Sequence, residues 1–84
     1  MNITLKLFAG LTDYLPLQGR DGNMVACEVR DGSTVGEVIE SCNLPPKLIH
    51  LVLVNGTYVE PPKRTIQQLR EGDVLAIWPP VAGG

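Results

Sequence analysis

The stretch that decides the fold is Asp-Gly-Ser-Thr-Val-Gly-Glu-Val-Ile-Glu-Ser-Cys, residues 31–42. Thr34 followed three residues later by Glu37 is a capping box, in which each side chain bonds the backbone of the other at a helix start. An apolar stripe follows at helical spacing, formed by Val35, Val38, Ile39 and Cys42. Pro45-Pro46 ends the pattern, because proline disfavours helix in the residue before it and cannot donate a backbone bond. The stretch therefore predicts one helix of about two turns with a single core-facing side.

The residues before this helix alternate between polar and apolar. Residues 1–7 carry Ile3, Leu5 and Leu7 on one face, which is the period-two pattern of a half-buried strand. Residues 24–30 repeat the pattern with Val25 and Cys27. The polar run 18–23 between them is rich in turn residues, and residues 11–15 have room for one helical turn. We expect an N-terminal antiparallel hairpin with a wide loop.

Beyond the helix, two runs are apolar throughout, residues 51–54 and 74–78. Asn55-Gly56 follows the first run directly and is a strong hairpin signal, so residues 57–60 are expected to return antiparallel. An exposed connection is expected at residues 61–64, and a single turn at 66–69. A right-handed crossover through the helix makes the strands that flank it parallel.

This order of elements predicts an α+β, β-grasp (ubiquitin-like) domain over residues 1–78. Its mixed sheet has four to five strands and holds one main helix packed on one face. A ferredoxin-like fold would need a second full helix, and the two prolines within residues 61–69 do not allow one there. Residues 79–84 form a separate extended tail that ends in Gly-Gly.

Composition narrows the class of protein. The chain has 84 residues, enough for one domain, and its 44% hydrophobic and 19% charged residues are typical of a folded protein. Seven Lys and Arg against nine Asp and Glu give a net charge of −2, which argues against binding nucleic acid. Two cysteines and one histidine are too few for a zinc site.

No run approaches the roughly 20 apolar residues of a membrane span, and the N-terminus lacks a secretion signal. These patterns argue against a membrane protein and favour a soluble, cytoplasmic one.

One face of the predicted sheet lacks a cover. Strands that are apolar on both sides belong at the centre of a sheet, yet a single helix can shield only one face. We therefore expect a partly exposed apolar patch that docks another protein. The alternative is that loops 11–23 and 57–69 fold over this face.

The last six residues, Pro79-Pro80-Val81-Ala82-Gly83-Gly84, have the composition of a tail that enters another protein. Two adjacent prolines cannot continue a sheet and favour an extended chain. At about 3.3 Å per residue the tail reaches on the order of 20 Å. The final glycines carry no Cβ, so the terminal carboxylate can pass through a narrow tunnel.

Several motifs resemble the sulfur carriers typified by the small subunit of molybdopterin synthase and by the thiamine-pathway carrier (the MoaD/ThiS family). They are Leu7-Phe8-Ala9, residues 31–35, Val54-Asn55-Gly56, Leu69 with residues 71–74, and the closing Pro79 to Gly84. Phe8-Ala9 and the Pro-Pro tail are more similar to the molybdopterin-synthase subunit.

The resemblance implies that the protein is a reactant rather than a catalyst. The Gly84 carboxylate would be adenylated by a separate E1-like enzyme that consumes ATP. A sulfur donor such as a cysteine desulfurase would then convert it to a thiocarboxylate. In the molybdopterin branch this terminus inserts into the large subunit of molybdopterin synthase. The chain itself has no phosphate-binding glycine loop, so no bound cofactor is expected.

Three other functions stay open at this stage. The sulfur could go instead to thiamine thiazole, to tRNA thiolation or to amino-acid synthesis. The chain could be a ubiquitin-like modifier joined to lysines through Gly84, or an adaptor with an inert tail.

The remaining candidate residues have both structural and functional interpretations. Phe8 and Trp78 are either core residues or anchors of a docking surface, together with Pro79, Pro80, Val81, Ala82 and Gly83 of the tail. Cys27 and Cys42 are interpreted as reduced core cysteines beneath the helix. His50 lacks an orienting partner for catalysis, and Lys63-Arg64 is either a solvated loop or an electrostatic contact for a partner.

Overall fold

The computed structural model describes residues 1–80, and its helix begins where the capping box predicts. Helix α1 spans Val35–Ser41. The Glu37 N–H donates to Thr34 Oγ1 over 3.1 Å, and the Thr34 N–H donates to Glu37 Oε1 over 3.0 Å. The stripe residues Val35, Val38 and Ile39 are buried. Both the start and the core-facing side of the predicted helix are therefore confirmed.

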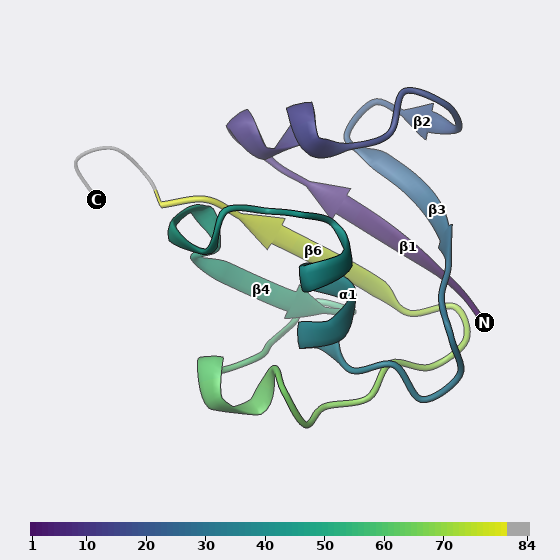
Figure 1. Cartoon of the computed structure of the whole chain (residues 1–84), viewed down its shortest axis with the longest axis vertical. Coiled ribbons are helices and arrows are strands. Elements are labelled where there is room, and N and C mark those ends of the chain that lie inside the picture. Colours follow the sequence, from purple (N-terminus) through teal and green to yellow (C-terminus); the bar gives the residue numbers. More distant parts are fainter. Residues whose placement is uncertain (81–84) are drawn as a thin grey trace.

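The sheet of the described residues has six strands in the order β2-β3-β1-β6-β4-β5 (Figure 1). The strands are β1 (Asn2–Leu7), β2 (Arg20–Asp21), β3 (Met24–Glu28), β4 (Leu51–Val54), β5 (Thr57–Tyr58) and β6 (Val74–Trp78). β1 runs antiparallel to β3 and parallel to β6, and β6 runs antiparallel to β4. The two strands that flank α1, β3 and β4, therefore point the same way, as the crossover rule predicts.

Three details of the fold differ from the sequence-based expectation. The sheet has one strand more than the upper value of the predicted four to five. The extra strand is Arg20–Asp21, which lies in the expected loop and folds back on β3 through a turn in which Gly22 has φ 60°. β5 ends at Tyr58 rather than residue 60, although the Val59 N–H still donates to Val52 O over 2.9 Å and the Val59 side chain is 1% exposed. A 3-10 helix forms at Pro61–Lys63, where two prolines favour a helix start, instead of a turn at 66–69.

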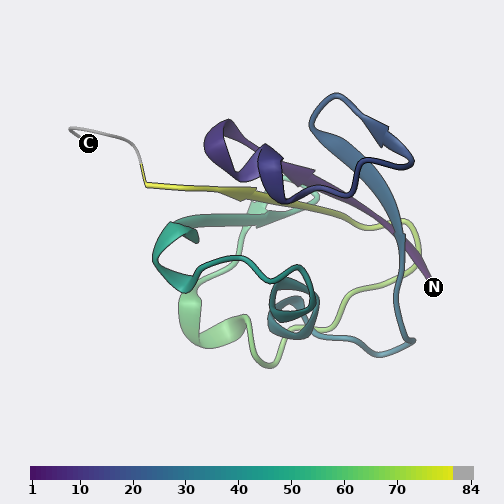
Figure 2. The ribbon, with the colours of Figure 1, turned by 45° about the horizontal axis from the view of Figure 1, so that its top comes forward.

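The helix and the segment after β5 lie on the same side of the sheet (Figure 2). The Val35 N–H donates to Gln67 O over 2.9 Å, and the Gly36 N–H donates to Arg64 O over 2.7 Å. A Cβ on Gly36 would stand 3.1 Å from that carbonyl oxygen, so a larger residue would push the two segments apart by a few tenths of an ångström. Val59 and Leu69 thereby join the core beneath the helix.

The opposite end of the core is closed by the segment after β1. A 3-10 helix at Ala9–Tyr14 includes the helical turn expected around residues 11–15, and its Leu11 is fully buried. A third 3-10 helix, Pro46–Leu48, follows α1 and leads into β4. The resulting architecture is the predicted β-grasp, with one α-helix held against one face of a mixed sheet.

Candidate functional site

The face of the sheet opposite α1 carries apolar side chains outside the core. We call it the open face and define it by Phe8, Leu51, Leu53, Tyr58, Val74, Ala76 and Trp78. Strand register places Leu51 beside Trp78 and Leu53 beside both Ala76 and Tyr58. The alternate residues Val52 and Ile77 are fully buried, whereas Leu51, Leu53 and Trp78 are only half-buried. Tyr58 is 50% exposed.

Ala76 is buried, and the other members of the open face lie outside the hydrophobic core of the described residues. The loops that could have covered it contribute to the core instead, through Leu11 and Leu15 on one side and Val59 and Leu69 on the other. The expectation of a partly exposed apolar face is therefore confirmed, and the alternative of loop coverage is wrong for these segments.

Phe8 and Trp78 meet at one end of the open face. Their rings are stacked, with centroids 3.9 Å apart and planes 7° from parallel. Parallel pairing of β1 with β6 brings them together, because each residue ends or follows its strand and the Phe8 N–H donates to Ile77 O over 3.2 Å. Ala9 then takes a left-handed φ of 52° and turns the chain away. The two aromatic residues singled out in the sequence thus form one feature.

The tail begins directly at this aromatic pair. Trp78 is the last residue of β6, and its carbonyl oxygen accepts a bond from the His50 N–H over 3.0 Å. Pro79 is half-buried and Pro80 is exposed, and the chain leaves the sheet there (Figures 1 and 2). Val81, Ala82, Gly83 and Gly84 were also predicted site residues, and they lie outside the described residues.

The two cysteines have properties of core thiols. Cys27 and Cys42 are half-buried, unbridged and packed against the core. Burial raises the pKa of the Cys27 thiol, and burial together with the neighbouring Cys27 raises the pKa of the Cys42 thiol. Both groups therefore stay protonated at neutral pH, which makes them poor nucleophiles.

Arg64 has a structural role that the sequence did not reveal. Its Nε donates to Val59 O over 3.2 Å and its Nη2 donates to His50 O over 3.3 Å, so the half-buried side chain joins two loops. The sequence analysis interpreted Lys63-Arg64 as a solvated loop or as an electrostatic contact for a partner, and neither interpretation included these two bonds. Lys63 is exposed, as expected. Within residues 1–80, no three His, Cys, Asp or Glu side chains lie close enough to hold a metal ion.

A second structural cluster joins two of the family-like motifs at the far end of β6. Asn55 Nδ2 donates to Asp73 Oδ1 over 2.8 Å, and Asn55 Oδ1 accepts from the Val74 N–H over 2.9 Å. Asp73 Oδ2 accepts from the Arg70 N–H over 2.8 Å. The Asn-Gly signal predicted the hairpin, but only the pairing of β4 with β6 brings the two turns together.

A family model described as the ThiS family matches residues 16–84. The chain belongs to the ThiS family. The match includes the tail, the open-face strands β4 and β6, and the capping box of α1. This ThiS-family chain is accordingly a small sulfur-carrier protein of the ThiS/MoaD type.

Solved structures place the ThiS-family chain among similar folds. The solution structure of the HVO 2177 protein from Haloferax volcanii is 30% identical, with a TM-score of 0.76 over 100% of this chain and 87% of that one. Small archaeal modifier protein 1 of H. volcanii is 24% identical, with a TM-score of 0.67 over 95% and 98% of the two chains.

A third similar structure comes from a complex. A chain of the complex of subunits 1 and 2 of molybdopterin-converting factor from Helicobacter pylori 26695 is 16% identical, with a TM-score of 0.63 and full coverage of both chains. No curated protein sequence gave a significant match. None of the helices within residues 1–80 has the length and apolar character needed to cross a membrane.

Proposed function

We propose that this protein is a sulfur carrier for molybdopterin biosynthesis, with the Gly84 carboxylate as the group that carries sulfur. An E1-like enzyme adenylates that carboxylate with ATP, which gives an acyl-adenylate and releases pyrophosphate. The terminal sulfur of a persulfide on a donor such as a cysteine desulfurase then displaces AMP, and a thiol reductant cleaves the resulting acyl disulfide to release the thiocarboxylate. The large subunit of molybdopterin synthase accepts the loaded tail. The thiocarboxylate sulfur bonds to the pterin precursor, and water then hydrolyses the acyl–sulfur bond, which leaves the sulfur on the precursor and restores the carboxylate.

One observation carries the proposal: the family match extends through Gly83-Gly84, and the tail that holds them begins at a half-buried, stacked aromatic pair. A carrier must present its terminus to several enzymes in turn, so it needs a docking surface beside the tail. The open face supplies apolar area, and Phe8 with Trp78 supplies the large rings that concentrate binding energy at interfaces. Pro79 and Pro80 direct the chain out of the sheet because neither can donate a ladder bond.

The molybdopterin branch is favoured by two observations. Phe8-Ala9 and the Pro-Pro tail resemble the small subunit of molybdopterin synthase, and a chain of the H. pylori molybdopterin-converting factor complex has a similar fold. ATP and a cysteine desulfurase are cytoplasmic reagents, so we place the reaction in the cytoplasm.

A second candidate function is conjugation of Gly84 to lysines of other proteins. The similarity to small archaeal modifier protein 1 of H. volcanii supports it. Both functions use the same adenylated terminus. They differ in the nucleophile that attacks the Gly84 carbonyl, which is sulfur for a carrier and a lysine amine for a modifier.

Intact-mass analysis of protein isolated from its native host tests the chemistry. A carrier gains the mass difference between one sulfur and one oxygen, while a modifier appears in covalent conjugates. Deleting Gly84, or adding one residue after it, should abolish loading with almost no change in thermal stability. Sulfur loading that survives in the lengthened variant would refute the proposed role of Gly84.

The docking role of the aromatic pair is tested with purified activating enzyme and synthase large subunit. Trp78→Ala and Phe8→Ala should each weaken complex formation by at least about tenfold, since anchors of this kind contribute about 2 kcal/mol or more. Tyr14→Ala is the matched control, because Tyr14 is 41% exposed and lies outside the open face. Equal affinities of all three variants would show that docking uses another surface. Conversion of a pterin precursor by the reconstituted complex would then assign the pathway.

A further inference from the structure

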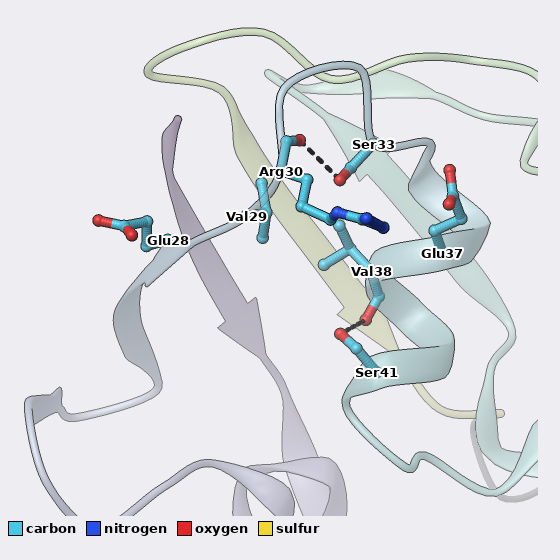
Figure 3. Close-up of a pocket in the computed structure, with 7 residues that line it drawn as sticks. All are labelled: Glu28, Val29, Arg30, Ser33, Glu37, Val38 and Ser41. Atoms are coloured by element: carbon cyan, nitrogen blue, oxygen red, sulfur yellow. Dashed lines mark hydrogen bonds between the residues drawn. The ribbon is translucent and has the colours of Figure 1, made fainter.

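A groove lies between β3 and α1, away from the tail and the open face. We call it the β3–α1 groove, and it is lined by Glu28, Val29, Arg30, Ser33, Glu37, Val38 and Ser41 (Figure 3). Its volume is about 310 Å³. That is the lower limit of pockets that hold small molecules, about 300–1,000 Å³, so the groove suits a side chain rather than a cofactor.

Within residues 1–80, no strand pairs with the last part of β3 on the edge beside this groove. β2 pairs only with Met24 and Val25, so it leaves the later part of β3 uncovered. The Val29 N–H donates to Met1 O over 2.8 Å on the β1 side. Because successive residues of an antiparallel strand point their backbone groups to opposite sides, the Glu28 N–H and C=O face the uncovered edge. A strand edge of this kind is a template for an additional strand.

The groove and the strand edge together restrict which peptide can be added as a strand. Val29 and buried Val38 provide an apolar floor, on which alternate side chains of an extended peptide can pack. Ser33 donates its N–H and its hydroxyl to Arg30 O over 3.1 and 2.7 Å, which turns the chain away and limits the edge to a few residues. An occupant therefore needs aliphatic residues at every second position.

The charged side chains beside the groove determine which residues are favoured at the other positions of the peptide, between the aliphatic ones. The Arg30 side chain extends toward α1, on which Glu37 lies, so a basic and an acidic side chain both border this end of the groove (Figure 3). Glu28 points away from the helix and is exposed, and its side chain makes no hydrogen bond or ion pair within residues 1–80. The residue directly across from Glu28 in an added strand is stabilised when it is basic. A second copy of this chain is disfavoured, because edge pairing centred on Glu28 would place two carboxylates opposite each other.

We propose that the β3–α1 groove and the free edge of β3 bind an extended peptide of alternating aliphatic and basic residues, which adds a strand beside Glu28. The mode is strand addition, in which main-chain bonds provide affinity and the groove provides side-chain selectivity. It leaves the tail free, so a partner bound here can stay in place while the terminus is loaded.

The test is an NMR titration of the isotopically labelled full chain with a capped nonapeptide that alternates Val and Lys. Amide signals of residues 26–30 and 38–41 should shift, and the Glu28 amide should become protected from hydrogen exchange. Signals of Leu53 and Trp78 on the open face should stay in place. A peptide with proline at its centre lacks the required N–H and should not bind.

A charge swap tests the assignment of Glu28. Replacing the central Lys of the peptide by Glu should weaken binding about fivefold, and Glu28→Lys should reverse this preference. Glu60→Lys makes the same charge change at an exposed residue outside the groove and should leave the preference unchanged. The proposal is overturned by absence of binding at millimolar peptide, by equal affinities for the two peptides, by shifts confined to the open face, or by self-association through β3.

Discussion

Alanine variants of Asn55 and Asn43 can show how much the bonds of Asn55 to Asp73 and Val74 contribute to the free energy of unfolding. The contribution is the difference between the costs of the two substitutions. Both residues are exposed and left-handed, with φ of 50° and 57°. Asn55 makes two side-chain bonds, to Asp73 and Val74, whereas no side-chain bond of Asn43 is found within residues 1–80. Asn43→Ala therefore changes the backbone preference alone, and Asn55→Ala changes both the backbone preference and the bonds.

The expected costs follow from these two contributions. Alanine in a left-handed conformation costs about 1 kcal/mol. Each exposed hydrogen bond contributes about 0.5 kcal/mol, the lower end of the usual range, because water replaces part of it. We expect Asn43→Ala to lower the free energy of unfolding by about 1 kcal/mol and Asn55→Ala to lower it by about 2 kcal/mol. For a domain of this size, the second change lowers Tm by about 8–16 °C.

Urea unfolding followed by tryptophan fluorescence measures both variants, since Trp78 lies in the central strand β6. The slope of the free energy against urea should stay constant, which shows that the compactness of the end states is unchanged. Equal destabilisation by the two substitutions would mean that the bonds to Asp73 and Val74 contribute nothing. Sulfur loading at Gly84 should persist in both variants at temperatures where they are folded.

Three further predictions concern the helix and the thiols. Ile39→Ala should cost about 2–5 kcal/mol in unfolding free energy by leaving a void under α1, and a cost below about 1 kcal/mol would contradict its packing. Bonds from the Thr34 backbone and hydroxyl lower the pKa of Glu37, so this carboxylate stabilises the fold above its ordinary pKa. That contribution should disappear as pH falls through the lowered folded-state value, and Glu37→Gln should remove this part of the pH dependence in denaturant titrations. Raised pKa values predict slow alkylation of Cys27 and Cys42 by iodoacetamide at neutral pH in the folded chain and faster alkylation in urea; equal rates would contradict their burial.

Features that depend on neighbours in sequence were predictable. The capping box needs only Thr34 and Glu37, and the β1 alternation needs only residues of one strand, so local physics determined both. The uncovered face of the sheet was predictable too, because two strands are apolar on both sides and a single helix can cover only one of those sides.

Features that depend on approach between distant segments were not predictable. Arg64 bonds the carbonyl groups of Val59 and His50, and no pattern in the sequence indicates that these two loops lie close together. Phe8 and Trp78 were each recognised, but their stacking depends on the parallel register of β1 and β6. The free edge of β3 likewise depends on how short β2 is.

The central place of β6 has a consequence for biosynthesis. β6 separates β1 from β4, so a nascent chain that has not yet released residues 74–78 holds two half-sheets with no strand between them. Contacts this far apart in sequence form late and slowly. The sheet therefore closes only after residues 74–78 have left the ribosome, so the end of β6 from which the tail departs is set in place in the last step of sheet assembly.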